Sequence, residues 1–165
     1  MSLLTWKIVV SRAAEDIFDY LADFSRHAEW SPRPFKIEPI SGGPLQVGSR
    51  FRSHGSLPRD WREYSNDVEV TALDRPWRIA FAATEHARVF KKEHALTFEN
   101  EFVLTPVGAG TEVERSLRTP SPPGVLGLVL PLLARWVIKP GVQAAMLRLK
   151  ENVDRYRDQV ADDSR

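Results

Sequence analysis

The sequence predicts an α+β domain in which helices and antiparallel strands occupy separate parts of the chain. A strand and two short helical stretches come first, residues 35–119 consist almost entirely of strand patterns, and a long amphipathic helix closes the chain. Consecutive strands between groups of helices are typical of an antiparallel α+β architecture. A strongly curved sheet wrapped around the last helix would bury the apolar faces of both.

The composition indicates one globular domain and excludes several kinds of chemistry. The chain has 165 residues, 42% of them hydrophobic and 27% charged, which is enough for a substantial core. Its net charge of +1 lacks the basic excess typical of nucleic-acid binding. It contains no cysteine, so disulfides, thiolate nucleophiles and cysteine-ligated zinc are excluded. We expect one domain over residues 1–160 and a frayed tail over 161–165.

The chain shows no pattern of a signal peptide or a membrane span. Its N-terminus lacks a charged leader followed by a long apolar core. The most apolar run, Val125–Ile138, is interrupted by Pro131 and Arg135 and is shorter than the about 20 residues that cross a bilayer. We therefore expect a cytoplasmic protein with no integral membrane segment.

The first elements follow from apolar spacing and capping residues. Residues Thr5–Val10 alternate between apolar and polar side chains, which predicts a strand with one buried face. Ser11 is suited to cap a helix predicted over Ala13–Ala22. A second short helix is predicted over Phe24–Trp30, and the prolines that follow end it.

Near the end of that second helix, two polar residues and one aromatic residue are expected to differ in burial. His27 and Glu29 are expected to face solvent, as polar side chains on a short surface helix usually do. Trp30 is expected to pack against the sheet or against the end of a cavity, since a large aromatic side chain gains most from burial.

Six further strands precede the last helix. Turn sequences separate them, chiefly SGGPL, LDRP and PVGAGT. The predicted strands cover residues 35–40, 47–54, 61–73, 77–84, 96–105 and 112–119. The final helix is predicted to carry one apolar stripe from Val142 to Val160.

The PVGAGT turn predicts which residues of the last two strands face each other. If Pro106 and Thr111 flank the turn, Phe102 faces Arg115 on the apolar side of the sheet. Asn100 then lies diagonal to Arg115, within reach of its long side chain. A buried arginine is costly without a partner, so it must either be paired or line a cavity.

The same argument applied to the LDRP turn places Asn66 beside Ala83 and Tyr64 beside Glu85. The inner face then carries the polar set Tyr64, Asn66, Glu85, Asn100 and Arg115. A few polar groups on apolar walls are typical of a small-molecule pocket. The pattern favours a cavity over a filled core.

The order of short motifs along the chain resembles a known family. The stretch AAEDIFDYLADFSRHAEWSP resembles the first helical segment of the START-like (SRPBCC) superfamily, in its polyketide cyclase/dehydrase-like branch. GGPLQVGSRF resembles the family's next hairpin, VGAGTEVERSL its turn into the last strand, and LRLKENVDRYRD its closing helix. The first segment matches at Ile17, Phe18, Tyr20, Leu21, Asp23 and Trp30.

This resemblance implies a helix-grip fold. In that fold a seven-stranded curved antiparallel sheet surrounds a long C-terminal helix, with two short helices between strands 1 and 2 and a deep cavity inside. Family members bind hydrophobic molecules such as lipids, sterols, polyketides, hormones and isoprenoids, and some are enzymes. The superfamily shares no catalytic residue, so none is carried over to this chain.

The leading hypothesis is a binding or carrier domain for a small hydrophobic ligand such as a lipid, polyketide or aromatic molecule. Asn66, Asn100 and Arg115 would orient one polar end, and Arg115 suits a carboxylate, phenolate or carbonyl. The predicted apolar wall consists of Phe81, Phe98, Phe102, Leu117, Trp136, Met146 and Leu149. We expect no nucleic-acid partner and a monomer or homodimer.

Two alternatives remain open. A cofactor-free cyclase or dehydratase would use Tyr64, Glu85 or His86 as its proton-transfer group. A protein-interaction module of the co-chaperone-activator type would use Val125–Ile138, a segment for which a packing element is favoured over a lid. The four histidines lack the spacing of a metal site, and we expect neither metal nor cofactor.

Overall fold

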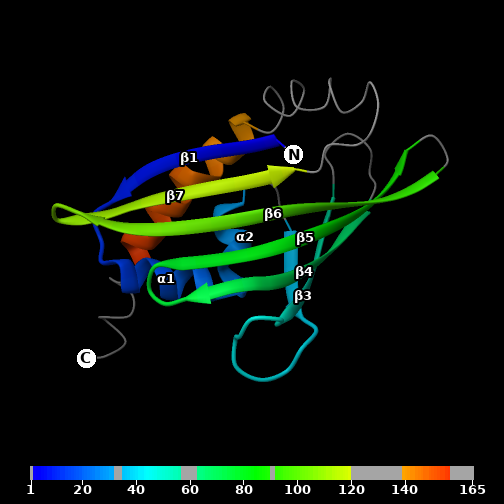
Figure 1. The fold of residues 1–165 in the computed structure, drawn as a ribbon, viewed down its shortest axis with the longest axis horizontal. Helices are drawn as coiled ribbons and strands as arrows, with labels where there is room; N and C mark the ends of the chain where they lie inside the picture. Colours follow the sequence, from blue (N-terminus) through cyan, green and yellow to red (C-terminus); the bar gives the residue numbers. More distant parts are fainter. Residues whose placement is uncertain (1, 32–34, 57–62, 90–91, 120–138, 157–165) are drawn as a thin grey trace.

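The computed structural model of the chain contains a seven-stranded antiparallel sheet, against which the helices pack (Figure 1). The structure describes residues 2–31, 35–56, 63–89, 92–119 and 139–156. The strand order is β1-β7-β6-β5-β4-β3-β2. The strands are β1 (Ser2–Val10), β2 (Phe35–Pro39), β3 (Arg50–Ser56), β4 (Glu63–Asp74), β5 (Arg78–Val89), β6 (Lys92–Val107) and β7 (Gly110–Thr119).

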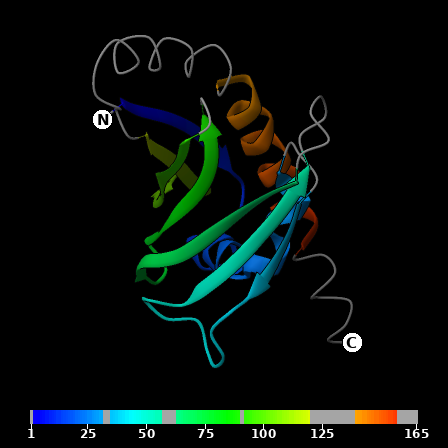
Figure 2. The ribbon, with the colours of Figure 1, turned by 90° about the vertical axis from the view of Figure 1, so that its right-hand side faces the viewer.

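The helices lie on the inner side of the curved sheet (Figure 2). Between β1 and β2 the chain forms α1 (Ala14–Ala22), the 3-10 helix η1 (Phe24–Arg26) and α2 (His27–Trp30). Residues 139–156 form the C-terminal helix, which packs on the sheet. The predicted α+β helix-grip architecture is confirmed.

The start of α1 differs from the prediction. The helix begins at Ala14 and its N-cap is Ala13, which makes no side-chain capping hydrogen bond, so the expectation for Ser11 was wrong. The chain needs residues 11–13 to leave the end of β1 before helical geometry can begin. Glu15 and Asp16 in the first turn place negative charge at the positive end of the helix dipole.

The predicted register of β6 and β7 is confirmed. Pro106 pairs with Thr111 and Phe102 pairs with Arg115. One further pair, Val107 with Gly110, leaves a two-residue turn in which Gly108 has a φ of 55°. That left-handed conformation costs glycine nothing, which explains why the turn sequence was informative.

The predicted register of β4 and β5 was wrong by two positions. Asn66 lies opposite Glu85 and not Ala83, so Tyr64 is not the partner of Glu85. The error arises at the LDRP turn: its flanking residues Ala72 and Trp77 do not pair, and Ala72 lies opposite Ala80, three positions away. One extra residue of β4 between Val70 and Ala72 then reduces the error to two positions. A shift of two positions keeps each side chain on its face, so Asn66 still points inward.

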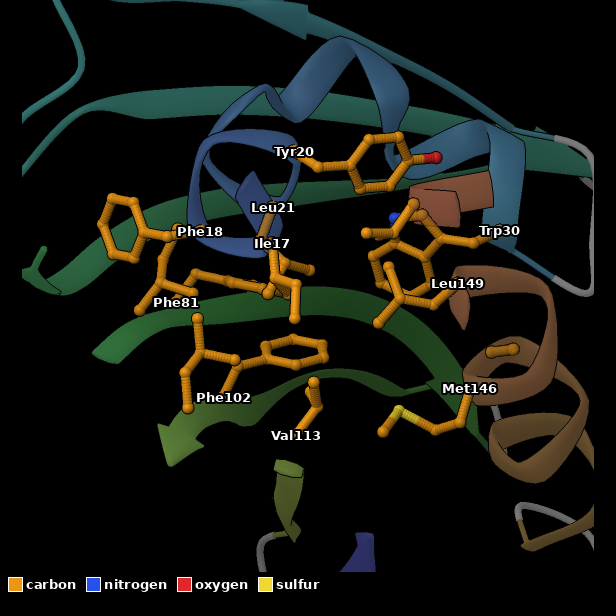
Figure 3. Packing of buried hydrophobic residues seen from close by; sticks show 14 of the residues in the cluster. Ile17, Phe18, Tyr20, Leu21, Trp30, Phe81, Phe102, Val113, Met146 and Leu149 are labelled. Atoms are coloured by element: carbon orange, nitrogen blue, oxygen red, sulfur yellow. The ribbon is translucent and has the colours of Figure 1, made fainter. Parts of the chain in front are cut away.

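The hydrophobic core lies between the sheet and the helices (Figure 3). In the predicted stripe of the C-terminal helix, the residues from Val142 to Val153 are buried and Tyr156 is partly buried, whereas Val160 lies outside the described residues. Each large aliphatic or aromatic side chain that becomes fully buried contributes about 2 kcal/mol. The members of the stripe that are buried are Val142, Ala145, Met146, Leu149 and Val153.

Candidate functional site

The interior is closely packed at the end of the sheet where α1 lies. The inward-facing side chains there are almost completely buried and belong to one hydrophobic cluster with α1. They are Val10, Val70, Ile79, Leu104 and Val113. This end of the fold is a filled core.

Farther along the same strands the inward-facing side chains keep accessible surface. Ala83, Phe98 and Asn66 are only partly buried, although their inner-face neighbours nearer α1 are buried. Arg115, the next inward position after Val113 on β7, also keeps some accessible surface. Asn100 and Leu117, which pair one inward step beyond Phe102 and Arg115, are still buried, so the polar residues begin within the buried part of the sheet.

Arg115 and Asn100 form the central polar contact of this region. Arg115 Nη2 donates a hydrogen bond to Asn100 Oδ1 at 2.7 Å. The guanidinium carbon lies 5.4 Å from the centre of the Trp30 ring and 5.3 Å from that of Phe102, within the range of cation–π contacts. A cation thus lies beside two aromatic rings, with a neutral amide as its described hydrogen-bond partner.

Burial lowers the pKa of Arg115 to about 10, and no charged group in the described part of the chain contributes to that shift. The guanidinium therefore remains protonated at neutral pH. Its Nε atom is buried and makes no hydrogen bond among the described residues. An unpaired charge in such surroundings is costly, which makes this group the strongest indication of a binding function.

Trp30, at the end of α2, covers the same polar pair. It is 5% exposed, and its ring meets Phe102 edge-on at 6.0 Å between centroids. The expectation that it packs against the sheet is confirmed. Its Nε1 atom is buried and, like Arg115 Nε, has no hydrogen-bond acceptor in the described segments.

His27 is buried, which contradicts the expectation that it faces solvent. It is 4% exposed, stacks on Phe24 at 4.4 Å, and its Nε2–H donates to the Leu21 carbonyl at 2.7 Å. Burial lowers the pKa of His27 to about 4, with a smaller lowering from the positive charge of Arg115. His27 is therefore neutral at pH 7. The prediction failed because a helix of one turn has no periodicity from which to read its buried side.

Glu29 keeps a partly exposed side chain and accepts a hydrogen bond from the Tyr20 hydroxyl at 2.7 Å. Arg26 also contacts this carboxylate, at 3.2 Å, and its guanidinium carbon lies 4.5 Å from the Tyr156 ring centre. This group ties α1 and α2 to the C-terminal helix. Its role is structural.

A second polar position lies away from Arg115. Asn66 on β4 has a buried Oδ1 without a described hydrogen-bond donor, and the buried Ser53 of β3 lies opposite it. Glu85, the partner of Asn66, is four residues along β5 from Phe81, the partner of Asn100, a separation of about 13 Å. The structure thus brings Asn100 and Arg115 together but leaves Asn66 apart. Ser53 was missed, although alternation along residues 51–55 would have placed it inward.

The remaining predicted site residues divide into two groups. The first group belongs to the hydrophobic core, where Phe98 is partly buried against the cluster. The members buried in the cluster are Phe81, Phe102, Leu117, Met146 and Leu149. The side chains of Tyr64, Glu85, His86 and the whole of Trp136 lie outside the described residues. Whether any of these residues touches a ligand remains a prediction.

Two hollows lined by described residues lie elsewhere on the molecule. One of about 440 Å³ is lined by Arg26, Glu29, Asn152, Arg155 and Tyr156. Another of about 270 Å³ lies between η1 and the β2–β3 loop, with Phe24 and Phe51 among its walls. Neither includes Asn100 or Arg115, so the interior cavity stays a prediction.

Within the described segments, no cluster of three or more histidine, aspartate or glutamate side chains could hold a metal ion. The helices described there include none that is both long and apolar enough to cross a membrane.

The sheet, the helices on its inner face and the C-terminal helix that packs on it define an α+β helix-grip-like protein. A sequence model of the family described as polyketide cyclase / dehydrase and lipid transport matches residues 2–154. The chain belongs to this family, as the resemblance of its motifs indicated.

Solved structures share the fold at low sequence identity. TTHA0849 from Thermus thermophilus aligns with a TM-score of 0.69 and 16% identity, over 92% of this chain and 97% of that one. Protein Ms6760 from Mycobacterium smegmatis has a TM-score of 0.64 and 19% identity, over 92% and 90%. DynU16, from the dynemicin biosynthetic locus, has a TM-score of 0.62 and 15% identity, over 92% of this chain and 47% of that one. No curated protein matches the sequence.

Proposed function

We propose that this protein binds or carries a small hydrophobic molecule between the sheet and the C-terminal helix, with the polar end of that molecule at Arg115 and Asn100. The observation that carries the proposal is the enclosed Arg115 cation. Its described hydrogen-bond partner is a neutral amide, and its described neighbours are aromatic rings.

The energetics favour a ligand over a purely structural role for Arg115. A buried charge stabilises a fold only when its partners compensate for lost hydration, and here Nε lacks a partner among the described residues. A ligand oxygen beside the guanidinium would provide that compensation. The apolar side chains around it would bury the rest of the ligand.

The family to which the chain belongs supports this class of ligand. Its description names both polyketide cyclases or dehydrases and lipid transport, and one structural neighbour is encoded in a biosynthetic locus. We therefore expect the ligand to be a lipid, a polyketide or an aromatic molecule. Catalysis by Tyr64, Glu85 or His86 and protein interaction through Val125–Ile138 depend on side chains outside the described residues, and no described contact favours them.

The proposal is tested by extraction and by binding. Purified protein would be treated with organic solvent and the extract analysed by mass spectrometry. Binding of fluorescent hydrophobic probes would be compared for the unmodified protein, Arg115→Met and Arg118→Met. Arg118 is a matched control because it lies on the same strand with its side chain 49% exposed and paired with Glu99. We expect a reproducible small molecule in the extract and weaker binding only in Arg115→Met. An empty extract together with no probe binding would contradict the proposal.

A further inference from the structure

We propose that the polar end of the ligand is an anionic oxygen group, a carboxylate or a phenolate, bound by the Trp30 and Arg115 side chains together. This inference rests on the proposed function and names the ligand chemistry that the site selects. It also adds Trp30 to the site as a hydrogen-bond donor, a role that its sequence position did not indicate.

The first argument is the kind of atom left without a partner. Trp30 Nε1 and Arg115 Nε are both buried, and neither has a hydrogen-bond acceptor among the described residues. Both atoms are donors and neither can accept, so the missing partner must be an acceptor. The guanidinium carbon is 5.4 Å from the centre of the Trp30 ring, so the two side chains that carry these donors are direct neighbours.

The second argument is charge. Arg115 is a cation whose described hydrogen-bond partner is neutral. His27 contacts Trp30 at 5.0 Å but is neutral at pH 7, so it does not supply a negative charge. The nearby carboxylates of Asp23 and Glu29 are already paired with Arg26. A ligand with one negative charge would neutralise the site, whereas a cationic ligand would be repelled.

The third argument is that the surroundings strengthen such a contact. Phe102 is completely buried and lies 5.3 Å from the guanidinium carbon, so water has little access to that side of the cation. Hydrogen bonds to charged groups in such surroundings contribute more than neutral ones. Discrimination between an anion and a neutral oxygen group is therefore expected to be measurable.

The test uses two series of probes that differ only in the polar end. One series is 1-naphthaleneacetate, 1-naphthaleneethanol and 1-naphthaleneethylamine, and the other is dodecanoate, dodecanol and dodecylamine. Affinities would be measured by calorimetry at pH 7.5. We expect the anion of at least one series to bind at least about tenfold more tightly than the alcohol, with the amine weakest.

Variants then assign the preference to the two donors. Trp30→Phe removes the N–H but keeps an aromatic ring, and Arg115→Met removes the charge. Both are expected to reduce the preference for the anion to less than about threefold while the alcohol still binds, and Arg118→Met is expected to retain it. Thermal unfolding would confirm that each variant folds. If Arg115→Met does not fold, the result for Trp30→Phe alone decides whether the donors set the preference for the anion.

The outcomes separate the two proposals. If the anion and the alcohol of each series bind equally, or if the preference survives both substitutions, the anionic ligand is ruled out and the carrier function stands. If no probe of either series binds and the organic extract is empty, the carrier function itself is contradicted.

Discussion

Arg115 of β7 donates a 2.7 Å hydrogen bond to Asn100 of β6, one step diagonal from its direct partner Phe102. The two side chains depend on each other unequally. Replacing Asn100 by an apolar residue leaves the Arg115 cation without its described acceptor. Removing Arg115 leaves only a neutral amide without a partner.

We therefore predict an asymmetry in stability. Asn100→Leu is expected to lower the free energy of unfolding by about 2 kcal/mol, because it leaves a buried cation without its acceptor. Arg115→Met is expected to cost less than about 1 kcal/mol, because it removes the charge as well. Urea denaturation would measure both. A larger loss from Arg115→Met than from Asn100→Leu would show that the pair is a stabilising structural contact and not a binding group.

A second prediction concerns the contact between Tyr20 and Glu29. Tyr20 is completely buried, and its hydroxyl donates to Glu29 at 2.7 Å. Tyr20→Phe is expected to lower the free energy of unfolding by about 1–2 kcal/mol, since the ring still packs but the hydrogen bond is lost. Glu29→Gln keeps an acceptor and is expected to cost less. An unchanged stability in Tyr20→Phe would mean that water replaces the Tyr20 hydroxyl as the donor to Glu29.

Burial and the Glu29 contact also raise the pKa of Tyr20. We expect ultraviolet titration of the folded protein to show one tyrosine that resists ionisation through the alkaline range, and Tyr20→Phe to remove it. Loss of a readily ionised tyrosine in that variant would contradict the assignment.

The sequence was sufficient for the Arg115–Asn100 contact because two strong local signals agreed. The alternation of residues 96–105 placed Asn100 inward, and the glycines after Pro106 set the register of the hairpin. The register of β4 and β5 was missed at the turn, because β4 runs on to Asp74, which pairs with Arg78, and Ala72 does not pair with Trp77. The extra residue of β4 between Val70 and Ala72 changes the register by one position and leaves the net error of two at Asn66.

Only those residues of the candidate site that lie on strands could be predicted from the sequence. Trp30 could be expected to pack inward from its size, but its unpartnered Nε1 depends on the relative placement of α2 and β6. His27 could not be predicted, because its burial follows from how η1 and α2 turn beneath the sheet. Such tertiary placement is not encoded in any local pattern of residues 24–30.

A third prediction concerns the close approach of β1 and β7. A Cβ atom at Gly110 would collide with the backbone carbonyl oxygen of Val10. Gly110→Ala is therefore expected to lower the free energy of unfolding by about 2 kcal/mol, since strands must move to admit the methyl group. Gly42→Ala is the control, because nothing lies within 4 Å of a Cβ there. Similar unfolding curves for the two variants would show that β1 is free to shift.

The last prediction follows from the buried His27. Its pKa is lowered to about 4 in the folded protein, from 6.5 for a free histidine. Between those values the unfolded chain binds a proton that the folded chain does not, so acid favours unfolding. The contribution of His27 is complete above pH 6.5 and is lost as the pH falls to about 4. It amounts to roughly 3 kcal/mol over that interval.

Denaturation midpoints measured from pH 7.5 to pH 4 would test this prediction by comparison of variants, because carboxylates elsewhere also contribute to acid sensitivity. His27→Gln is expected to be less stable than the unmodified protein at pH 7.5, because it disturbs the stack on Phe24 and the hydrogen bond to Leu21, but to lose less stability on acidification. His54→Gln is the control, since His54 is exposed on β3. A pH dependence of His27→Gln as steep as that of the control would mean that His27 takes up its proton in the folded state, and hence that water reaches the interior beside Arg115.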